Sequence, residues 1–171
     1  MLTLSLLRHA KSSWSEARLK DFERPLNERG RKAAPRMGAF MARRGLVPDL
    51  ILCSSAVRAR ETLDLVLPRL KAAPAVVYED ALYLASSATM LKRLHKVPAE
   101  IGHAMVVGHN PGLKSLALEL LGAGAEAEWE ALAEKLPTGG LVVIAFDVAG
   151  WSKVKRRAGR LELFTAPKRL P

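Results

Sequence analysis

The sequence predicts an α/β fold, a three-layer α/β/α sandwich with a mainly parallel central sheet. Three short apolar runs, Leu2 to Leu7, Leu50 to Cys53 and Ala104 to Val107, are each bounded by turn residues and followed by a segment with helical periodicity. Alternation of this kind is typical of βαβ units, whose helices cover both faces of the sheet. Because 171 residues suit one core and no Pro/Gly/Ser-rich linker interrupts them, we expect a single domain over residues 1–171.

The first half of the chain predicts two strands and two helices. The polar segment from residue 11 to 27 is loop-like, and Asn27 then caps a helix whose apolar stripe includes Met37 and Met41. Pro35 lies inside this pattern and predicts a kink or a later start. Residues 49–55 form the second strand, and apolar residues from 63 to 70 mark the face of the second helix.

The second half continues the alternation. Residues 75–78 are a third strand, and Ser86 or Ser87 caps the next helix. The fourth strand ends at Gly108, after which Asn110 caps a helix with Pro111 at its first position. Residues 141–146 and 161–164 are late strands, joined by a basic turn around Trp151, and residues 126–136 are helical.

Charge and cysteine content limit which partners the protein can bind and in which cellular compartment it is expected. The chain has 27 Lys and Arg against 17 Asp and Glu, a formal charge of +10, which attracts anions without saying which. A single cysteine, Cys53, excludes an intramolecular disulfide and gives no CxxC pattern. We expect a cytoplasmic protein, because no signal-peptide pattern opens the chain and no apolar run approaches membrane-spanning length.

Cationic and imidazole side chains follow three of the predicted strands. The strand ends read Arg8-His9, Ser54 to Arg58, and Gly108-His109-Asn110-Pro111-Gly112. Ligands of parallel sheets bind outside the carboxyl ends of the strands, so these residues predict one pocket for a phosphoryl group. Arg58 begins a helix whose free amides favour anions, and its planar fork can bind two phosphate oxygens.

The two histidines at strand ends suit phosphoryl transfer. A neutral imidazole is nucleophilic near pH 7, and nearby arginines disfavour its protonation, so His9 is a candidate nucleophile. His109 can donate to a phosphoryl oxygen as charge develops in the transition state. A hydrogen-bonded structural histidine is the alternative for a residue at a strand end. His95, expected mid-helix, and His103, expected before the fourth strand, are interpreted as surface residues.

Two other phosphate chemistries do not fit the spacing. A cysteine phosphatase needs an arginine six positions after its cysteine, and Ala59 stands there after Cys53. Cys53 is therefore interpreted as a small buried hydrophobe. The segment from Gly108 to Gly112 lacks the Gly-Lys-Ser/Thr ending of a P-loop, so nucleotide binding has little support.

The motifs resemble the histidine phosphatase, or phosphoglycerate mutase-like, superfamily. They are Leu7-Arg8-His9-Ala10, Arg24-Pro25-Leu26 with Gly30, Ser54 to Ala59 with Thr62, and Gly108 to Gly112. The short chain, the continuation Lys11 to Trp14 and the Gly-His-Asn-Pro-Gly form point to its SixA-like phosphohistidine phosphatase branch. The likeness covers about residues 2 to 146 and implies a phosphoglycerate mutase-like fold.

The resemblance also implies roles for individual residues. His9 is phosphorylated during turnover, Arg8 and Arg58 clamp the phosphoryl oxygens, and His109 completes the pocket. Ser12 and Arg24 are further candidate substrate contacts, with Lys20 a weaker one. Neither a metal nor a cofactor is expected, because fixed cations neutralise the developing charge.

The leaving group favours phosphohistidine as substrate. Phosphomonoesterase branches place a carboxylic acid after the third strand, and here only Glu79 and Asp80 are near, neither at a clearly matching place. An alkoxide needs such a proton donor, whereas a protonated imidazole leaves readily near pH 7. The expected substrate is a histidine-phosphorylated signalling protein, with a small phosphorylated metabolite as the alternative. Glu79 and Asp80 otherwise form an ordinary polar turn.

A non-enzymatic reading is a module that binds nucleic acid or an acidic partner. It rests on the basic cluster of Lys153, Lys155, Arg156, Arg157 and Arg160. That stretch has one aromatic residue, Trp151, and no RRM-like or helix-turn-helix pattern, so a solvated loop is the simpler interpretation. We therefore expect no nucleic-acid partner, no membrane contact and a monomer.

Overall fold

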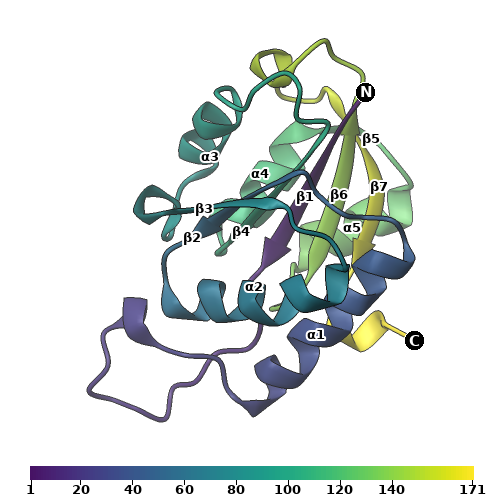
Figure 1. Cartoon of the computed structure of the whole chain (residues 1–171). Helices are drawn as coiled ribbons and strands as arrows, with labels where there is room; N and C mark the ends of the chain where they lie inside the picture. The colour runs from purple at the N-terminus through teal and green to yellow at the C-terminus, as the bar shows by residue number, and fades with distance from the viewer.

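The computed structural model describes residues 1–171 and contains one seven-stranded sheet in the order β3-β2-β4-β1-β6-β7-β5 (Figure 1). Strands β1 to β4 are parallel, and β6 runs antiparallel to both β1 and β7. The mainly parallel sheet predicted from the sequence is thus confirmed. The strands are β1 (Leu2–Arg8), β2 (Leu50–Ser54), β3 (Ala75–Glu79), β4 (His103–Gly108), β5 (Leu121–Ala123), β6 (Leu141–Phe146) and β7 (Gly159–Thr165).

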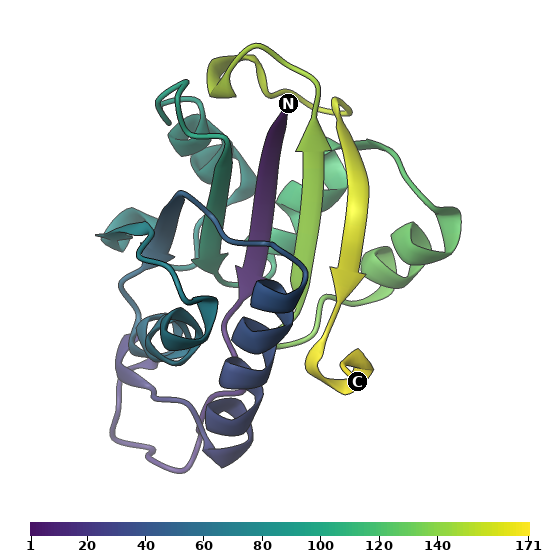
Figure 2. The same cartoon turned by 45° about the vertical axis from the view of Figure 1, so that its right-hand side comes forward.

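Five α-helices cover the two faces of the sheet, which completes the predicted three layers. Helices α1 (Glu28–Arg43) and α2 (Val57–Leu70) pack together on one face. Helices α3 (Ser87–Leu94), α4 (Gly112–Leu120) and α5 (Glu126–Glu134) lie on the other, as Figure 2 shows. None of these helices is long and apolar enough to cross a bilayer.

Alternating side chains of the central strands pack into two separate hydrophobic cores, one on each face of the sheet. On β2, Leu50 and Leu52 belong to the cluster beneath α3, α4 and α5, whereas Ile51 and Cys53 belong to the cluster beneath α1 and α2. This alternation is the period of two that an extended strand imposes. Because both faces of the sheet are covered by helices and apolar, its central strands appear in the sequence as continuous hydrophobic runs.

Helix α1 begins where the sequence predicts. The side chain of Asn27 accepts a hydrogen bond from the backbone N–H of Gly30 at 2.9 Å, which satisfies one of the amides left free at the helix start. The helix runs from Glu28 through Pro35, so the later start suggested by that proline is wrong. Ser86 caps α3 in the same way, through the N–H of Thr89.

Two local expectations need correction. The residue preceding α4 is Pro111 rather than Asn110, and α4 begins at Gly112. Asn110 still contributes, because its Oδ1 accepts from the N–H of Lys114 at 3.3 Å. The predicted helix over 126–136 ends at Glu134, and the short strand β5 before it had no sequence signal.

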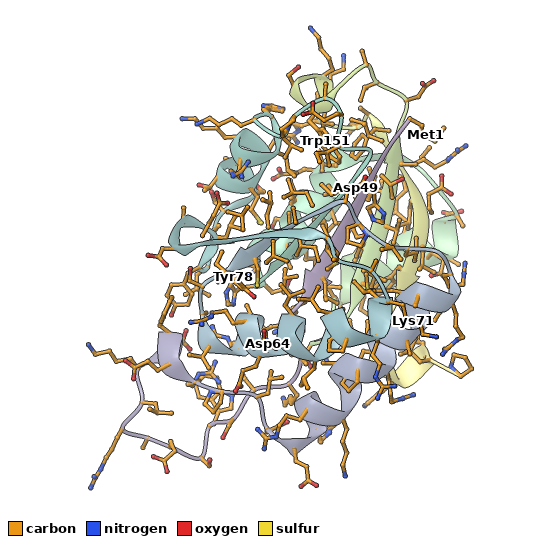
Figure 3. All side chains as sticks on the ribbon, in the orientation of Figure 1. Met1, Asp49, Asp64, Lys71, Tyr78 and Trp151 are labelled. Atoms are coloured by element: carbon orange, nitrogen blue, oxygen red, sulfur yellow. The ribbon has the colours of Figure 1, made fainter.

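The connection between β6 and β7 closes the end of the sheet where the chain begins. Phe146 pairs with Leu2 across β6 and β1, so residues 147–158 lie at the amino end of β1. Trp151 is buried there and donates from Nε1 to the carbonyl of Ile101; Figure 3 shows it at the same end of the molecule as Met1. The basic residues 153, 155, 156, 157 and 160 are exposed at this end, which fits the predicted solvated loop.

Candidate active site

The carboxyl ends of β1, β2 and β4 meet around a cavity of about 200 Å³. Arg8 pairs with Gly108 at the last position of the β1–β4 ladder, which brings His9 and His109 to the same edge. Six of the residues that the sequence proposed for the site, Arg8, His9, Ser12, Arg24, Arg58 and His109, line this cavity, and Lys20 does not. Its lining is Arg8, His9, Lys11, Ser12, Trp14, Arg24, Arg58, Leu84, His109, Asn110 and Thr138.

The hydrogen bonds of His9 fix which ring nitrogen carries the proton. Nδ1 lies 2.7 Å from the carbonyl oxygen of Ala10, and a carbonyl can only accept, so Nδ1 holds the hydrogen. On the other side of the ring, Nε of Arg58 donates to Nε2 of His9 at 3.3 Å. A donor aimed at Nε2 requires a lone pair there. His9 therefore presents an unprotonated Nε2 to the cavity.

Burial and positive neighbours keep His9 neutral. The pKa of His9 is lowered to about 3, first by burial and then by the charges of His109, Arg58 and Arg8. The hydrogen bond to Ala10 acts in the opposite direction without reversing the shift. A neutral imidazole is the nucleophilic form, so the ring holds its reactive state far below neutral pH.

His109 is the second buried imidazole of the cavity. Its ring centroid lies 5.2 Å from that of His9, and its Nε2 lies 2.7 Å from Oγ of Ser54. Burial and then the charge of Arg58 lower the pKa of His109 to about 4. Nδ1 of His109 is buried and has no hydrogen-bond partner in the protein. An oxygen of a bound anion would supply the missing partner.

Arg8 and Arg58 approach the imidazoles from different elements, strand β1 and helix α2. Arg58 is 3 % exposed and lies in the first turn of α2, next to the helix amides that favour anions. Arg8 ends β1 and donates from Nη1 to the carbonyl of Leu136, while its buried Nε has no partner. Burial and then the charge of Arg58 lower the pKa of Arg8. Two guanidinium groups thus share one small cavity, where an anion would relieve their repulsion.

Asp21 is a functional candidate that the sequence did not reveal. It opens a short 3-10 helix in the loop after β1, and its Oδ2 accepts from Nη2 of Arg58 at 2.9 Å. Tyr83 donates its hydroxyl to the same oxygen. Desolvation acts to raise the pKa of Asp21. Hydrogen bonds from Tyr83, Arg24 and Arg58 outweigh this effect and lower the pKa to about 2. The residue is an ionised anchor for the arginines.

Ser12 and Arg24 form a polar wall of the cavity. Nη1 of Arg24 donates to Oγ of Ser12 at 2.8 Å, and Nε of Arg24 donates to Oδ1 of Asp21 at 3.0 Å. The guanidinium of Arg24 also lies 3.4 Å from the ring centroid of Trp14. Both predicted residues therefore reach the cavity, with Arg24 held on three sides.

A threonine links the loop after β1 to helix α2. The backbone N–H of Ala10 donates to Oγ1 of Thr62 at 2.9 Å, and Oγ1 donates to the carbonyl of Arg58 at 2.7 Å. The hydroxyl therefore joins the segment that carries His9 to the helix that carries Arg58. Thr62 belongs to the motif noticed in the sequence, but its role becomes visible only from these contacts.

Other residues considered in the sequence lie away from the cavity. Glu79 pairs with Arg93, with its carboxylate 2.7 Å from Nε, and neither Glu79 nor Asp80 lines the cavity. Lys20 also does not line it. Cys53 is fully buried, and burial raises the pKa of its thiol to about 12, which agrees with a hydrophobic role.

The two remaining histidines differ partly from expectation. His95 is exposed, as predicted, but follows the last residue of α3 rather than lying mid-helix, and its Nε2 contacts the carbonyl of Val154 at 2.7 Å. His103 is half-buried within β4, where Nε2 lies 2.8 Å from Oγ of Ser5. The surface assignment of His103 is therefore wrong, because a cross-strand hydrogen bond holds the ring against the sheet.

The lining determines which chemistry the cavity can perform. It contains four cations, two imidazoles held neutral by burial and positive charge, and no carboxylate. No group of three or more His, Cys, Asp or Glu side chains is arranged to hold a metal ion. Such a lining suits a compact oxyanion bound next to a nitrogen nucleophile.

Known proteins are similar to this chain in fold and in sequence. The model of the histidine phosphatase superfamily (branch 1) matches residues 4–83. The solved structure of a "putative phosphohistidine phosphatase SixA" from Agrobacterium tumefaciens has 34% identity and a TM-score of 0.82, covering 97% of this chain and 98% of that one. A second structure with the same description, from Nakamurella multipartitia, has 26% identity and the same TM-score, covering 97% of this chain and 96% of that one.

An uncharacterized protein of Mycobacterium tuberculosis is 34% identical over 165 residues, which is 95% of this chain and 100% of that protein. The likeness thus extends over nearly the whole of each sequence, well beyond the residues that the family model matches. Together with the shared fold, these matches make the chain a member of the histidine phosphatase superfamily, with SixA phosphatases among its structural neighbours.

Proposed function

We propose that the protein is a phosphatase that works through a phosphohistidine intermediate on His9. The observation that carries this proposal is the unprotonated Nε2 of His9, which receives a hydrogen bond from Arg58 inside a cavity lined by cations. A nucleophile and the groups that neutralise an oxyanion are thus adjacent before any ligand binds. This preorganisation is the main source of rate acceleration in phosphoryl transfer.

The reaction proceeds in two displacements at phosphorus. Nε2 of His9 attacks the phosphoryl group in line, the bond from phosphorus to the leaving group breaks, and a phosphorylated His9 remains. A water molecule then attacks the same phosphorus, the bond to Nε2 breaks with its electron pair returning to the ring, and a proton of the water passes to a phosphate oxygen, so that inorganic phosphate leaves as dihydrogen phosphate. His9 returns to its neutral form, ready for the next turnover.

The surrounding side chains stabilise the charge of both transition states. Arg58 and Arg8 donate to the phosphoryl oxygens, and the unpartnered Nε of Arg8 supplies one of these donors. Nδ1 of His109 supplies another, because the hydroxyl of Ser54 can donate to Nε2 and leave the hydrogen on Nδ1. Ser12 and Arg24 complete the wall. In this proposal the fixed cations do the neutralising that a metal would otherwise do.

Phosphohistidine on a signalling protein is the substrate that best fits the cavity. The lining holds no carboxylic acid to protonate an alkoxide leaving group. An imidazole leaving group needs little such help, because it is protonated near its ordinary pKa of about 6.5. The SixA phosphatases among the structural neighbours support the same substrate class. A small phosphate monoester is the competing substrate, and its hydrolysis is the direct comparison.

The test is a substrate panel combined with trapping of the intermediate. The purified protein is given a histidine-phosphorylated protein, a phosphoserine peptide and small phosphate esters, and phosphate release is measured for each. With 32P-labelled substrate, we expect label on the wild-type protein that is stable in base and lost in acid. We expect no label and no turnover for His9→Ala. His95→Ala is the control, because its ring is exposed and outside the cavity.

Two results would contradict the proposal. Turnover by His9→Ala above a trace would exclude His9 as nucleophile. Much faster hydrolysis of the phosphate esters than of phosphohistidine would exclude the leaving-group argument and leave a phosphomonoesterase.

A further inference from the structure

A second, larger cavity of about 690 Å³ lies next to the catalytic one. Arg8, Lys11 and Thr138 line both, so the two spaces share a wall. We call the larger space the cationic groove. Its lining is Arg8, Lys11, Arg29, Ala33, Lys135, Pro137, Thr138, Ala166, Pro167, Lys168 and Arg169, which includes six cations and no carboxylate.

Most of the cations in the groove have no partner of opposite charge. Lys11, Arg29, Lys135 and Lys168 are exposed and form no ion pair. Arg169 alone is paired, with a carboxylate oxygen of Glu128 at 3.5 Å. Like charges brought together without partners oppose folding, so nothing in the fold itself calls for this arrangement. Complementary anions from outside would relieve it.

The groove is assembled from segments that are far apart in the chain. Lys11 follows β1, Arg29 lies in the first turn of α1, Lys135 follows α5, and Lys168 belongs to the last 3-10 helix, Pro167–Arg169. These cations line a space of about 690 Å³, compared with about 200 Å³ for the catalytic cavity, so the space they surround is larger than one phosphoryl group fills. A surface of this kind matches several separate negative charges better than it matches one compact anion.

The rim of the catalytic cavity adds apolar contacts on the same surface. Trp14 is 73 % exposed and Leu84 is 53 % exposed, and both line that cavity. Leu84 also adopts a positive φ of 49°, which is unfavourable for a branched side chain. A phosphoryl group bound in a pocket of about 200 Å³ is too small to cover these two exposed side chains, so they offer contacts to a larger part of the substrate.

We propose that the cationic groove docks the carboxylates of an acidic protein segment whose phosphohistidine enters the catalytic cavity. The inference rests on the proposed function and adds the recognition surface to it. Carboxylate side chains flanking the phosphohistidine lie along Lys11, Arg29, Lys135 and Lys168, while Trp14 and Leu84 contact the apolar part of the same partner. Charge complementarity of this type raises the rate of encounter and fixes orientation more than it adds affinity.

The test uses two synthetic phosphohistidine peptides of equal length. In one, glutamates flank the phosphohistidine, and in the other glutamines replace them. For the wild-type protein at low salt, we expect kcat/KM to be about tenfold higher for the acidic peptide, the lower end of the range for electrostatic steering. We expect this preference to shrink as salt is added, because exposed charges are screened.

Charge reversal in the groove should remove the preference. The variant is Lys135→Glu with Lys168→Glu, and the matched control is Lys155→Glu with Arg156→Glu at the opposite end of the sheet. Both variants change the net charge equally. We expect the groove variant to treat the two peptides alike and the control to keep the wild-type ratio. Free phosphohistidine should be hydrolysed at the wild-type rate by both.

The outcomes separate this inference from the proposed function. If the wild-type protein hydrolyses neither the phosphohistidine peptides nor free phosphohistidine, the proposed function fails. If it hydrolyses the peptides but uses the two equally, or if both variants lose the preference equally, the docking inference fails. A groove-dependent preference for a bisphosphate ester over the acidic peptide would also overturn the inference, because it would assign the groove to a small substrate.

Discussion

The carboxylate of Asp21 joins two arginines of the cavity, accepting from Arg58 at 2.9 Å through one oxygen and from Arg24 at 3.0 Å through the other. The backbone carbonyl of Asp21 also accepts from Nη1 of Arg58, at 2.7 Å. One residue of the loop after β1 therefore sets the orientation of a guanidinium on α2. A planar guanidinium bound at several points has few alternative positions.

Replacing Asp21 by Asn should lower activity without removing any residue that lines the cavity. We expect kcat/KM for phosphohistidine to fall about tenfold to a hundredfold, because small displacements of positioned groups have effects of this size. The loss should appear in kcat as well as in KM, since Arg58 acts on the transition state. Steady-state kinetics of the purified variant measure both.

Glu23→Gln is the matched control for Asp21→Asn. Glu23 is exposed on the same 3-10 helix and forms no ion pair, so the same loss of charge should leave kcat/KM near the wild-type value. Equal effects of the two substitutions would mean that Asp21 acts only through net charge and not by positioning Arg58.

The protonation state of His9 predicts an NMR signature. At pH 6 the ring should be neutral with its hydrogen on Nδ1, because the pKa is lowered to about 3 and Ala10 accepts from Nδ1. Long-range 15N–1H spectra distinguish this tautomer from the Nε2–H form and from imidazolium, and His9→Ala identifies the signal. A charged ring at pH 6, or a hydrogen on Nε2, would remove the nucleophile from the proposal.

Acid should destabilise the folded protein through the same two imidazoles. An unfolded chain protonates histidine near pH 6.5, whereas His9 and His109 bind protons only near pH 3 and pH 4 in the folded state. Between about pH 6.5 and pH 4 the unfolded chain therefore binds more protons at these two histidines than the folded protein does. The free energy of unfolding falls as pH falls through this range. Urea unfolding of the wild type and of His109→Gln should show a shallower pH dependence for the variant.

Thr62 should be replaceable by Ser but not by Val. Valine has nearly the same shape but cannot accept from the N–H of Ala10, and leaving a buried donor without a partner costs about 1–3 kcal/mol. Serine keeps the hydroxyl. We expect Thr62→Val to lower both the melting temperature and kcat, and Thr62→Ser to restore most of both. A fully active, stable valine variant would show that this hydroxyl does not hold His9 in place.

Gly30 permits the close contact between α1 and the loop after β1. A Cβ at Gly30 would lie 2.2 Å from the carbonyl oxygen of Lys11, a distance that requires the backbone to move. We expect Gly30→Ala to destabilise the fold by about 1–3 kcal/mol, as overpacking does, and to reduce activity because Ser12 is displaced. At Gly102 a Cβ would meet only Oδ2 of Asp49, at 3.7 Å, so Gly102→Ala should be tolerated.

Sequence patterns predicted the parts of the molecule that depend on local signals. Apolar runs fixed the central strands, and turn residues after them placed Arg8, His9, Arg58 and His109 at one edge. These four side chains do line one cavity, as do Ser12 and Arg24. Strand ends are visible in sequence because polarity changes there, and parallel strands bring such ends together.

The features that sequence reasoning missed depend on contacts across long loops. Asp21 lies in the polar segment between β1 and α1, and nothing local distinguishes its carboxylate from that of Glu23. Its link to Arg58 spans 37 residues and exists only in the folded chain. His103 was misassigned for the same reason, since its partner Ser5 is 98 residues away. The strand β5 is too short, at three residues, to show any periodicity.

The antiparallel direction of β6 has a consequence for protein engineering. Because β6 runs against β1, the segment that enters it arrives at the edge where the parallel strands end, and there Gly139 donates to the carbonyl of His9 and Leu136 accepts from Arg8. The region from 122 to 138 therefore contacts the site through Leu136, which accepts from Arg8, and through Thr138, which lines the cavity, while the reactive groups come from other elements. Exchange of that region between superfamily members should change substrate selectivity and leave the catalytic residues in place.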